Sequence, residues 1–224
     1  MFKLAGHHNW LIFRLINPAL ETRLKKYAKG RLLDIGCGIK PYKEMAAPYV
    51  REHVGLDHRD TQHDVSNVDL FGTAYSIPTE DESFDTILCT DVLEHLEEPK
   101  QAITETRRVL KPGGYAIYTI PLFWHLHEEP RDFYRYTKHG LKYLFESNGF
   151  QLVDCEALSG YWVTMAQETT YYLLRFRRGG LINPLWWIVP PVNILIQTLA
   201  YLLNLVDRSK QFTMEYILVV QKPS

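Results

Sequence analysis

The stretch RLLDIGCG, residues 31–38, decides the fold class of this chain. Its apolar part has the pattern of a short strand buried in a parallel sheet, and it runs directly into a Gly-x-Gly turn. Gly36 and Gly38 suit a tight turn with positive φ and allow a ligand to approach the backbone. Amide groups at such a turn favour an anionic group, either phosphate or carboxylate. Turns also use glycine for geometry alone, so this loop by itself is weak support for a binding site.

An acidic residue closes the next apolar run. Asp57 ends the stretch VGLD, residues 54–57, about 20 residues after the loop, where nucleotide-binding folds place an acid on the ribose hydroxyls. Such a charge-assisted hydrogen bond contributes roughly 1.5–3 kcal/mol. Pro41 stands where a dinucleotide fingerprint needs Gly or Ala. The loop therefore suits a mononucleoside better than NAD, and a nicotinamide-dependent oxidoreductase is the alternative.

Short apolar runs alternate with helical patterns over most of the chain, which predicts βαβ units and a parallel sheet. Pro99 opens the clearest helix, residues 99–110, and Thr137 is the expected N-cap of a second one. Asn17 and Pro18 predict the start of an amino-terminal helix that ends at Gly30. The expected strands are residues 32–35, 53–56, 68–71, 86–89, 115–120, 150–154 and 215–221.

Composition bounds the class of protein. The 224 residues are 46% hydrophobic and 23% charged, which suits one domain with a full core and excludes a disordered, collagen-like or disulfide-framework protein. A net charge of −1 gives no field that attracts nucleic acid. Three widely spaced cysteines are typical of reduced cytoplasmic thiols. Arg14 interrupts the apolar residues 10–16 and no cleavage site follows, so no signal peptide is expected.

Several stretches follow one another along the chain in a characteristic order: LLDIGCG (32–38), VGLD (54–57), AYSIP (74–78) with SFD (83–85), DVLEHL (91–96) and RVLKPGG (108–114). With these stretches the chain resembles the class I S-adenosylmethionine-dependent methyltransferases, in particular the small-molecule group called methyltransferase type 11. The resemblance implies a doubly wound, Rossmann-like α/β sheet of seven strands with an antiparallel last strand, and S-adenosyl-L-methionine as cofactor.

The resemblance also implies cofactor-binding residues. Thr73 departs from the family, which often has an acid at this position. The implied residues are Asp34, Gly36, Cys37 and Gly38 at the methionine end, Asp57 on the ribose hydroxyls, His58 against the adenine, Thr73 and Ala74 at the adenine edge, and Asp91 beside the methionine moiety.

Residues 125–137, here called the acceptor wall, follow the strand at 115–120 and are dense in His, Tyr, Arg and acidic side chains. We expect His127 to act as base or proton shuttle, oriented by Glu128 or Asp132, while Arg135 and Tyr136 bind the acceptor. The equal alternative is a loop held together by an Arg–Asp pair. His95 either faces the acceptor pocket or packs locally, and we favour local packing. His125 and His127 lack a third ligand of fitting spacing, so no metal is expected.

Residues 181–206 contain no charged side chain. We expect Asn183, Pro184, Pro190 and Pro191 to break the first half of this segment. The remaining 15 residues, 192–206, would form a helix of about 22 Å, short of a hydrocarbon core of roughly 30 Å. The segment packs on its own domain, joins two subunits or lies in a membrane interface. Arg175, Arg177 and Arg178 before it, with its two tryptophans, resemble an interfacial anchor. We favour an interfacial or substrate-pocket role.

The expected protein is one domain over residues 1–224: a helical segment (1–30), a cofactor-binding core (31–160), an apolar helical insertion (161–212) and a final strand (213–224). It would be a cytoplasmic enzyme that methylates a small, hydrophobic or lipid-linked acceptor, with oxygen the favoured atom. Peripheral membrane contact or a homodimer through 181–206 is left open, and no nucleic-acid partner is expected. The rival of another class is a non-catalytic, membrane-tethered cofactor-binding module.

Overall fold

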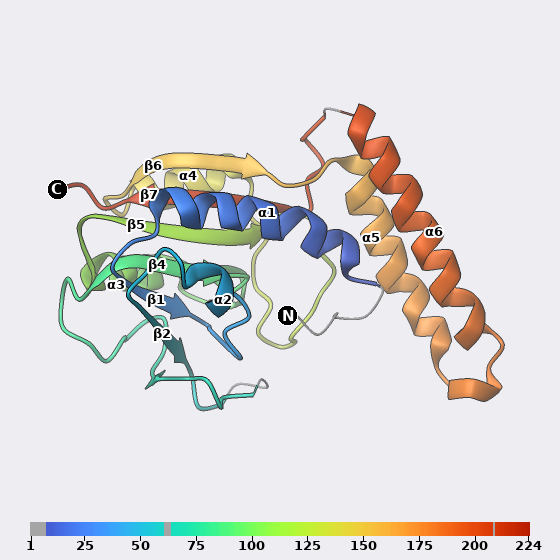
Figure 1. Ribbon diagram of the computed structural model, residues 1–224, viewed down its shortest axis with the longest axis horizontal. Coiled ribbons are helices and arrows are strands. Elements are labelled where there is room, and N and C mark those ends of the chain that lie inside the picture. The colour runs from blue at the N-terminus through green and yellow to red at the C-terminus, as the bar shows by residue number, and fades with distance from the viewer. Residues whose placement is uncertain (1–7, 61–63, 208) are drawn as a thin grey trace. The chain divides into compact units, whose positions relative to one another are not determined.

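Seven strands form one sheet within the residues that the computed structural model describes, 8–60, 64–207 and 209–224. Residues 1–7 of the expected amino-terminal segment lie outside these ranges. The strand order is β3-β2-β1-β4-β5-β7-β6 (Figure 1). The strands are β1 (Arg31–Ile35), β2 (Glu52–Asp57), β3 (Leu70–Phe71), β4 (Phe84–Thr90), β5 (Leu110–Pro121), β6 (Gln151–Ala157) and β7 (Glu215–Gln221).

The central strands are parallel and buried. Leu33 of β1 lies opposite Val54 of β2 on one side and Ile87 of β4 on the other. The order reverses at β1, so the carboxyl ends of β1 and β4 flank the switch point where ligands bind in open α/β sheets. The amide of Gly113 donates to the carbonyl of Lys222, whose amide donates back to Gly114, so the last strand is antiparallel. The predicted fold class is confirmed.

The helices follow the apolar patterns with two exceptions. In α3, the side chains of Ala102, Ile103 and Val109 are buried on one face. The hydroxyl of Thr137 caps α4 by accepting a hydrogen bond from the amide of Gly140, as predicted. The helices are α1 (Trp10–Tyr27), α2 (Lys43–Ala46), α3 (Pro99–Val109), α4 (Lys138–Glu146), α5 (Tyr161–Leu174) and α6 (Leu185–Val206), with 3-10 turns η1 (Leu93–His95), η2 (Arg175–Arg177) and η3 (Gly180–Ile182).

Both exceptions are helices that contain proline. The predicted start at Asn17 is wrong, because α1 begins at Trp10 and includes Pro18. The predicted break at Pro190 and Pro191 is also wrong, because α6 runs through both. An internal proline costs a helix about 3 kcal/mol. In α1, burial of Leu11, Ile16, Leu20 and Leu24 outweighs that cost, at roughly 1.5–3 kcal/mol for each side chain.

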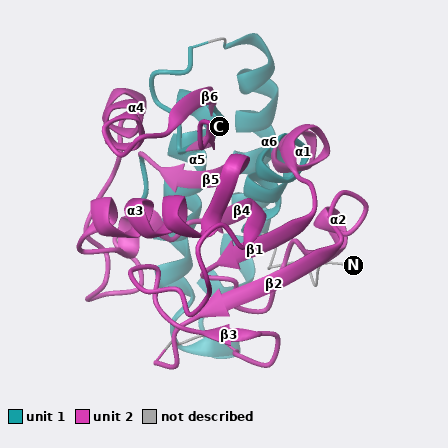
Figure 2. Ribbon diagram, turned by 90° about the vertical axis from the view of Figure 1, so that its left-hand side faces the viewer, with its two compact units in different colours: residues 1–19, 123–125, 157–215 teal, residues 20–122, 126–156, 216–224 magenta. Residues whose placement is uncertain are grey.

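Two compact units divide the chain (Figure 2). Unit 2 comprises residues 20–122, 126–156 and 216–224, and holds nearly all of the sheet with α2, α3 and α4. Unit 1 comprises residues 1–19, 123–125 and 157–215, and includes the whole of the expected apolar insertion, 161–212. Within unit 1, the buried side chains of Leu11, Val163, Ala166 and Ala200 form a hydrophobic core. The organisation of residues 1–224 as one domain stays a prediction.

Candidate active site

The glycine loop after β1 is held tightly from both sides. Gly36 has φ +70°, and a Cβ atom there would lie 2.4 Å from Cγ2 of Val92, so only glycine fits without displacing its neighbour. The amides of Gly36 and Cys37 both donate to the carbonyl of Leu56. Three residues after Cys37, the ammonium group of the buried Lys40 contacts the carboxylate of Asp69. The backbone at Gly36 is therefore held in place and has no side chain that would keep a ligand away from it.

Asp57 connects this loop to the end of β2. One carboxylate oxygen accepts a hydrogen bond from the amide of Gly38 at 2.9 Å, and the other accepts one from the amide of His58 at 2.8 Å. Its side chain lines a cavity and is almost fully buried. Two backbone amides thus fix the carboxylate and leave it further acceptor capacity toward the cavity.

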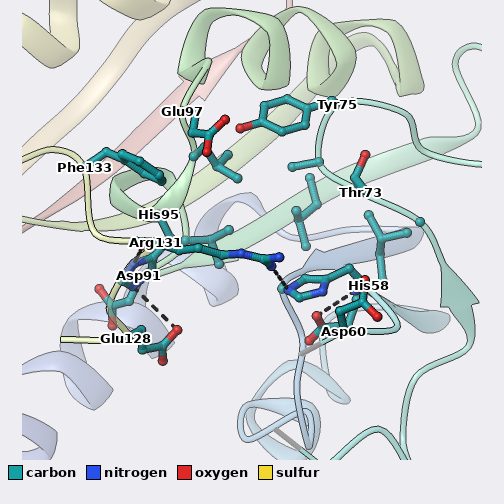
Figure 3. Close-up of a pocket in the computed structure, with 18 of the residues that line it drawn as sticks. His58, Asp60, Thr73, Tyr75, Asp91, His95, Glu97, Glu128, Arg131 and Phe133 are labelled. Atoms are coloured by element: carbon teal, nitrogen blue, oxygen red, sulfur yellow. Dashed lines mark hydrogen bonds and ion pairs between the residues drawn. The ribbon is translucent and has the colours of Figure 1, made fainter. Parts of the chain in front are cut away.

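The cavity has a volume of about 650 Å³ and lies in unit 2, at the carboxyl ends of the central strands (Figure 3). This volume is in the ordinary range for sites that bind small molecules, roughly 300–1,000 Å³. It brings together most of the expected cofactor residues. Those that line it are Gly36, Asp57, His58, Thr73, Ala74 and Asp91.

Asp34, Cys37 and Gly38 do not line the cavity. Asp34 is buried at the end of β1, where its carboxylate lies 2.9 Å from Nε2 of His53. Burial raises the pKa of Asp34, and the contact with His53 opposes that shift. Burial also raises the pKa of the Cys37 thiol to about 12, so this thiol is not a nucleophile at neutral pH. The assignment of these three residues to the cofactor stays a prediction.

Asp91 is positioned by an unusual backbone conformation just after β4. It is a non-glycine residue with φ +53°, a conformation that costs of order 1–3 kcal/mol and tends to occur at functional sites. The amide of Asp91 donates to the carbonyl of Thr119, and the hydroxyl of Thr119 donates to its carboxylate at 3.2 Å. These two bonds hold the carboxylate at the edge of the cavity.

Part of the acceptor wall also lines the cavity. Glu128, Pro130, Arg131 and Phe133 line the cavity, and the amide of Phe133 donates to the carbonyl of Glu94. In Figure 3 the side chain of Arg131 reaches across toward His58, where a guanidinium nitrogen lies 3.3 Å from Nε2. This bridge joins the acceptor wall to the end of β2.

None of the three expected catalytic residues lines the cavity. Arg135 makes two hydrogen bonds, at 2.6 and 2.7 Å, to the buried carboxylate of Asp132, and this contact holds the pKa of Asp132 far below its usual range. The hydroxyl of Tyr136 donates to the carbonyl of Leu93 at 3.3 Å, and burial raises its pKa. Burial and the nearby His95 lower the pKa of His127. For Arg135 these contacts favour the structural alternative.

In the stretch DVLEHL that follows β4, sequence reasoning missed Glu94 and favoured local packing for His95. His95 lines the cavity rather than only packing locally. Glu94 is fully buried, and burial raises its pKa well above the usual value. Donor atoms of Glu94, His95 and His127 all lie within 4.8 Å of one another. His125 belongs instead to unit 1, where it lies 3.4 Å from Glu168. The signal in the sequence that points to these residues is their position, because DVLEHL begins directly after β4 ends.

Residues 33–118 match the family model described as a methyltransferase domain. The chain is 36% identical over 98 residues to the uncharacterized methyltransferase YcgJ of Bacillus subtilis, a match that covers 39% of each chain. It is 28% identical over 127 residues to a ubiquinone biosynthesis O-methyltransferase of Alkalilimnicola ehrlichii, covering 52% of this chain and 49% of the relative. The matches thus span about half or less of these relatives.

Solved structures share the fold over most of this chain. The crystal structure of the [4+2]-cyclase SpnF has a TM-score of 0.61 and 21% identity, and the match covers 92% of this chain and 81% of that one. Phosphoethanolamine N-methyltransferase 2 of Haemonchus contortus, in complex with S-adenosyl-L-methionine, has a TM-score of 0.58 and 16% identity, with 97% and 56% covered. Over residues 33–118 the chain therefore matches a methyltransferase domain, in agreement with the predicted resemblance.

Proposed function

We propose that this protein transfers a methyl group from S-adenosyl-L-methionine to a small acceptor, with oxygen the favoured atom. The observation that carries the proposal is the cavity at the switch point of the sheet, which joins the bare backbone of Gly36 to the carboxylates of Asp57 and Asp91. The residues fit the cofactor, because a nucleoside needs an acceptor for its ribose hydroxyls and a close approach to backbone amides.

The bound cofactor supplies an electrophilic methyl group on a sulfonium centre. Asp57 binds the ribose hydroxyls, and Asp91 lies beside the methionine end. Arg131 and the acceptor wall exclude water and hold the acceptor in line with the methyl–sulfur bond. Positioning of this kind can supply roughly 7–11 kcal/mol of the barrier.

An oxygen acceptor requires a group that takes its proton or lowers its pKa. We infer that the imidazoles of His95 and His127 and the carboxylates beside them serve this need. Support comes from His95 and Glu128, which line the cavity, and from the rings of His95 and His127, whose centroids are 4.6 Å apart. Binding of the acceptor by Arg135 and Tyr136 stays a prediction. The similarity to ubiquinone biosynthesis O-methyltransferases agrees with an oxygen acceptor.

The test is binding followed by turnover. Calorimetric titration should show that the purified protein binds S-adenosylhomocysteine and not NAD. Incubation of lipid and metabolite extracts with the cofactor labelled in its methyl group should then transfer label to an acceptor. NAD binding without S-adenosylhomocysteine binding would assign the cavity to an oxidoreductase. Cofactor binding without transfer to any extract would favour the non-catalytic module.

We further propose that the hairpin of α5 and α6 contacts a lipid bilayer. The two helices lie side by side in unit 1 (Figure 1). Helix α6 has 22 residues, about 33 Å at 1.5 Å per residue. Within the described part of the chain, α6 is long and apolar enough to cross a membrane, judged by length and composition alone. The helix is longer than the length of about 22 Å expected from the sequence, because it continues through Pro190 and Pro191.

The polarity of this hairpin is inverted relative to a pair of helices in water. Four of its polar side chains point inward: Gln167, Thr170, Asn193 and Gln197 are all fully buried. The amide group of Asn193 donates to the carbonyl of Thr170 on the facing helix. Its apolar side chains are exposed on α6, namely Trp187, Ile188, Ile194, Leu195, Leu199, Leu202 and Leu205. Water-exposed helices show the opposite arrangement, whereas lipid favours this one.

The residues at the turn between α5 and α6 indicate which kind of partner contacts the hairpin. Arg177 lies over the ring of Trp186 at 4.1 Å, and Trp187 is 64% exposed beside it. Arginine and tryptophan together are typical of the boundary between acyl chains and anionic headgroups. No charged residue follows until Asp207. A bilayer with anionic headgroups matches both the basic end and the apolar face.

Flotation with phosphatidylglycerol-containing vesicles tests this proposal. The wild type should float, and the double variant Leu195→Lys/Leu199→Lys should lose at least nine-tenths of its flotation, because both side chains are exposed. Tyr143→Lys, an exposed aromatic position on α4, is the matched control and should float normally. A wild type that remains unbound as a stable dimer would replace lipid by a second copy of the chain as the partner of this face.

A further inference from the structure

Glu94 is an unusual residue beside the cavity. Its side chain is fully buried, and neither carboxylate oxygen has a hydrogen-bond partner within the described part of the chain. A buried carboxyl group without a partner is costly. One donor atom from each of Glu94, His95 and His127 lies within 4.8 Å of the other two.

His95 is oriented as a ligand. Its Nδ1 lies 2.6 Å from the carbonyl oxygen of Arg131, and a carbonyl can only accept, so Nδ1 carries the proton. In the neutral ring, Nε2 then presents a lone pair. Nε2 lies 3.7 Å from Oε1 of Glu94 and 4.0 Å from Oε2 of Glu128. Without a proton, Nε2 cannot donate a hydrogen bond to either carboxylate oxygen.

The separations of 3.7 and 4.0 Å from Nε2 of His95 are close to those of two donors around one cation. Nitrogen and oxygen ligands lie about 2.0–2.2 Å from a metal ion, so two ligands of the same ion are separated by roughly 3–4 Å. Metal-binding histidines also donate their second ring N–H to a carbonyl or carboxylate. The bond from His95 to the Arg131 carbonyl is of this kind.

His127 has a comparable support. Its amide donates to Asp132 at 3.0 Å, and its Nδ1 lies 3.4 Å from the same carboxylate oxygen. Arg135 holds that carboxylate from the other side. The pair of Asp132 and Arg135 therefore orients the imidazole of His127 toward His95, and this gives both residues a positioning role.

We propose that Glu94, His95 and His127, with Glu128 as a fourth ligand, bind a divalent first-row metal ion beside the cofactor cavity. Two imidazoles with carboxylates suit Mn²⁺, Fe²⁺ or Zn²⁺ better than Ca²⁺. The sequence spacing of His125 and His127 misses this site, because its ligands come from two segments that meet only in the fold.

The consequence for the reaction rests on the proposed function. A metal ion bound at His95 and Glu128 adjoins the cavity, where it can accept an acceptor hydroxyl as a ligand and lower its pKa. The hydroxyl proton leaves to solvent, the oxygen forms a bond to the methyl carbon, and the carbon–sulfur bond breaks with its electron pair on sulfur. The substrate class is then a phenol, an enol or a pair of adjacent hydroxyl groups.

Metal binding can be measured without any acceptor. After treatment with EDTA, the full-length protein is titrated with Mn²⁺ and followed by electron paramagnetic resonance, with Zn²⁺ as a competitor. The wild type should bind about one equivalent. His95→Ala and Glu94→Gln should each weaken binding at least tenfold while they retain S-adenosylhomocysteine binding and the circular dichroism of the wild type. His139→Gln, an exposed histidine on α4, is the control and should bind as the wild type does.

The outcomes separate the two proposals. A wild type that binds S-adenosylhomocysteine but shows no saturable Mn²⁺ or Zn²⁺ site would overturn the metal site and leave methyl transfer standing. Equal weakening by His139→Gln would also overturn it, since the ion would then lie elsewhere. One equivalent of metal lost in both ligand variants, without any S-adenosylhomocysteine binding, would support the metal site and remove the methyltransferase proposal.

Discussion

The carboxylate of Asp57 accepts a hydrogen bond of 2.9 Å from the amide of Gly38. The acid expected to bind ribose and the loop expected to approach the cofactor are thus parts of one hydrogen-bonded unit. The second oxygen of Asp57 is bound by the amide of His58. A change at Asp57 will therefore act on cofactor affinity both directly and through the conformation of the loop.

Asp57→Asn should weaken binding of S-adenosylhomocysteine by about 10- to 100-fold, the equivalent of a lost charge-assisted hydrogen bond of roughly 1.5–3 kcal/mol. The amide keeps one oxygen acceptor, so the protein should remain folded. Isothermal titration calorimetry measures the change. Asp64→Asn, at an exposed position outside the cavity, is the matched control. Equal affinity in the wild type and Asp57→Asn would remove Asp57 from the ribose site.

Local patterns predict the sheet well. The apolar run at residues 215–221 predicts β7 with the bounds that it has, because a strand buried on both faces needs an unbroken apolar run. Pro18, Pro190 and Pro191 mislead, because the cost of a missing helical hydrogen bond is local, whereas the apolar burial that offsets it in α1 depends on the tertiary fold.

The acceptor side of the site is much less visible in the sequence. Glu94 and His127 lie in different segments, and the amides of Phe133 and Tyr134, which donate to the carbonyl of Glu94, hold those segments together. No spacing rule predicts such contacts. The density of His, Arg and acidic residues in the acceptor wall indicates function but does not distinguish Arg131, which lines the cavity, from Arg135, which pairs with Asp132.

Gly36→Ala should destabilise the protein by about 1–3 kcal/mol, since alanine at φ +70° is strained and its Cβ would lie 2.4 Å from Val92. Urea unfolding at neutral pH measures the loss. The double variant Gly36→Ala/Val92→Ala removes the collision but not the strain, so it should lose less stability than the sum of the two single variants. Strict additivity would mean that the two side chains do not collide.

Arg135→Ala should lower the free energy of unfolding by about 3 kcal/mol, because it leaves the carboxylate of Asp132 buried without its cation. Adding Asp132→Asn should recover part of this loss. A purely acceptor-binding role predicts instead that Arg135→Ala raises KM and leaves stability unchanged. Chemical denaturation and steady-state kinetics on the same preparations separate these results.

Asp85 should make stability depend on acid pH. Although partial burial opposes the shift, hydrogen bonds from the amide of Arg31 and the ammonium of Lys111, both at 2.9 Å, hold the pKa of Asp85 below its usual value. The ionised carboxylate therefore stabilises the folded state above the unfolded-state pKa of about 4, and this contribution is lost as the pH falls further, because the unfolded chain binds the proton first.

Asp85→Asn should thus cost about 1–2 kcal/mol at pH 7, and the difference from the wild type should shrink as the pH falls to about 3. Urea unfolding at several pH values measures both proteins. Asp81→Asn is the control, since Asp81 is largely exposed where it pairs with Arg108 and exposed pairs contribute little. A difference between the wild type and Asp85→Asn that stays constant from pH 7 to pH 3 would show that the ionisation of Asp85 does not contribute to stability.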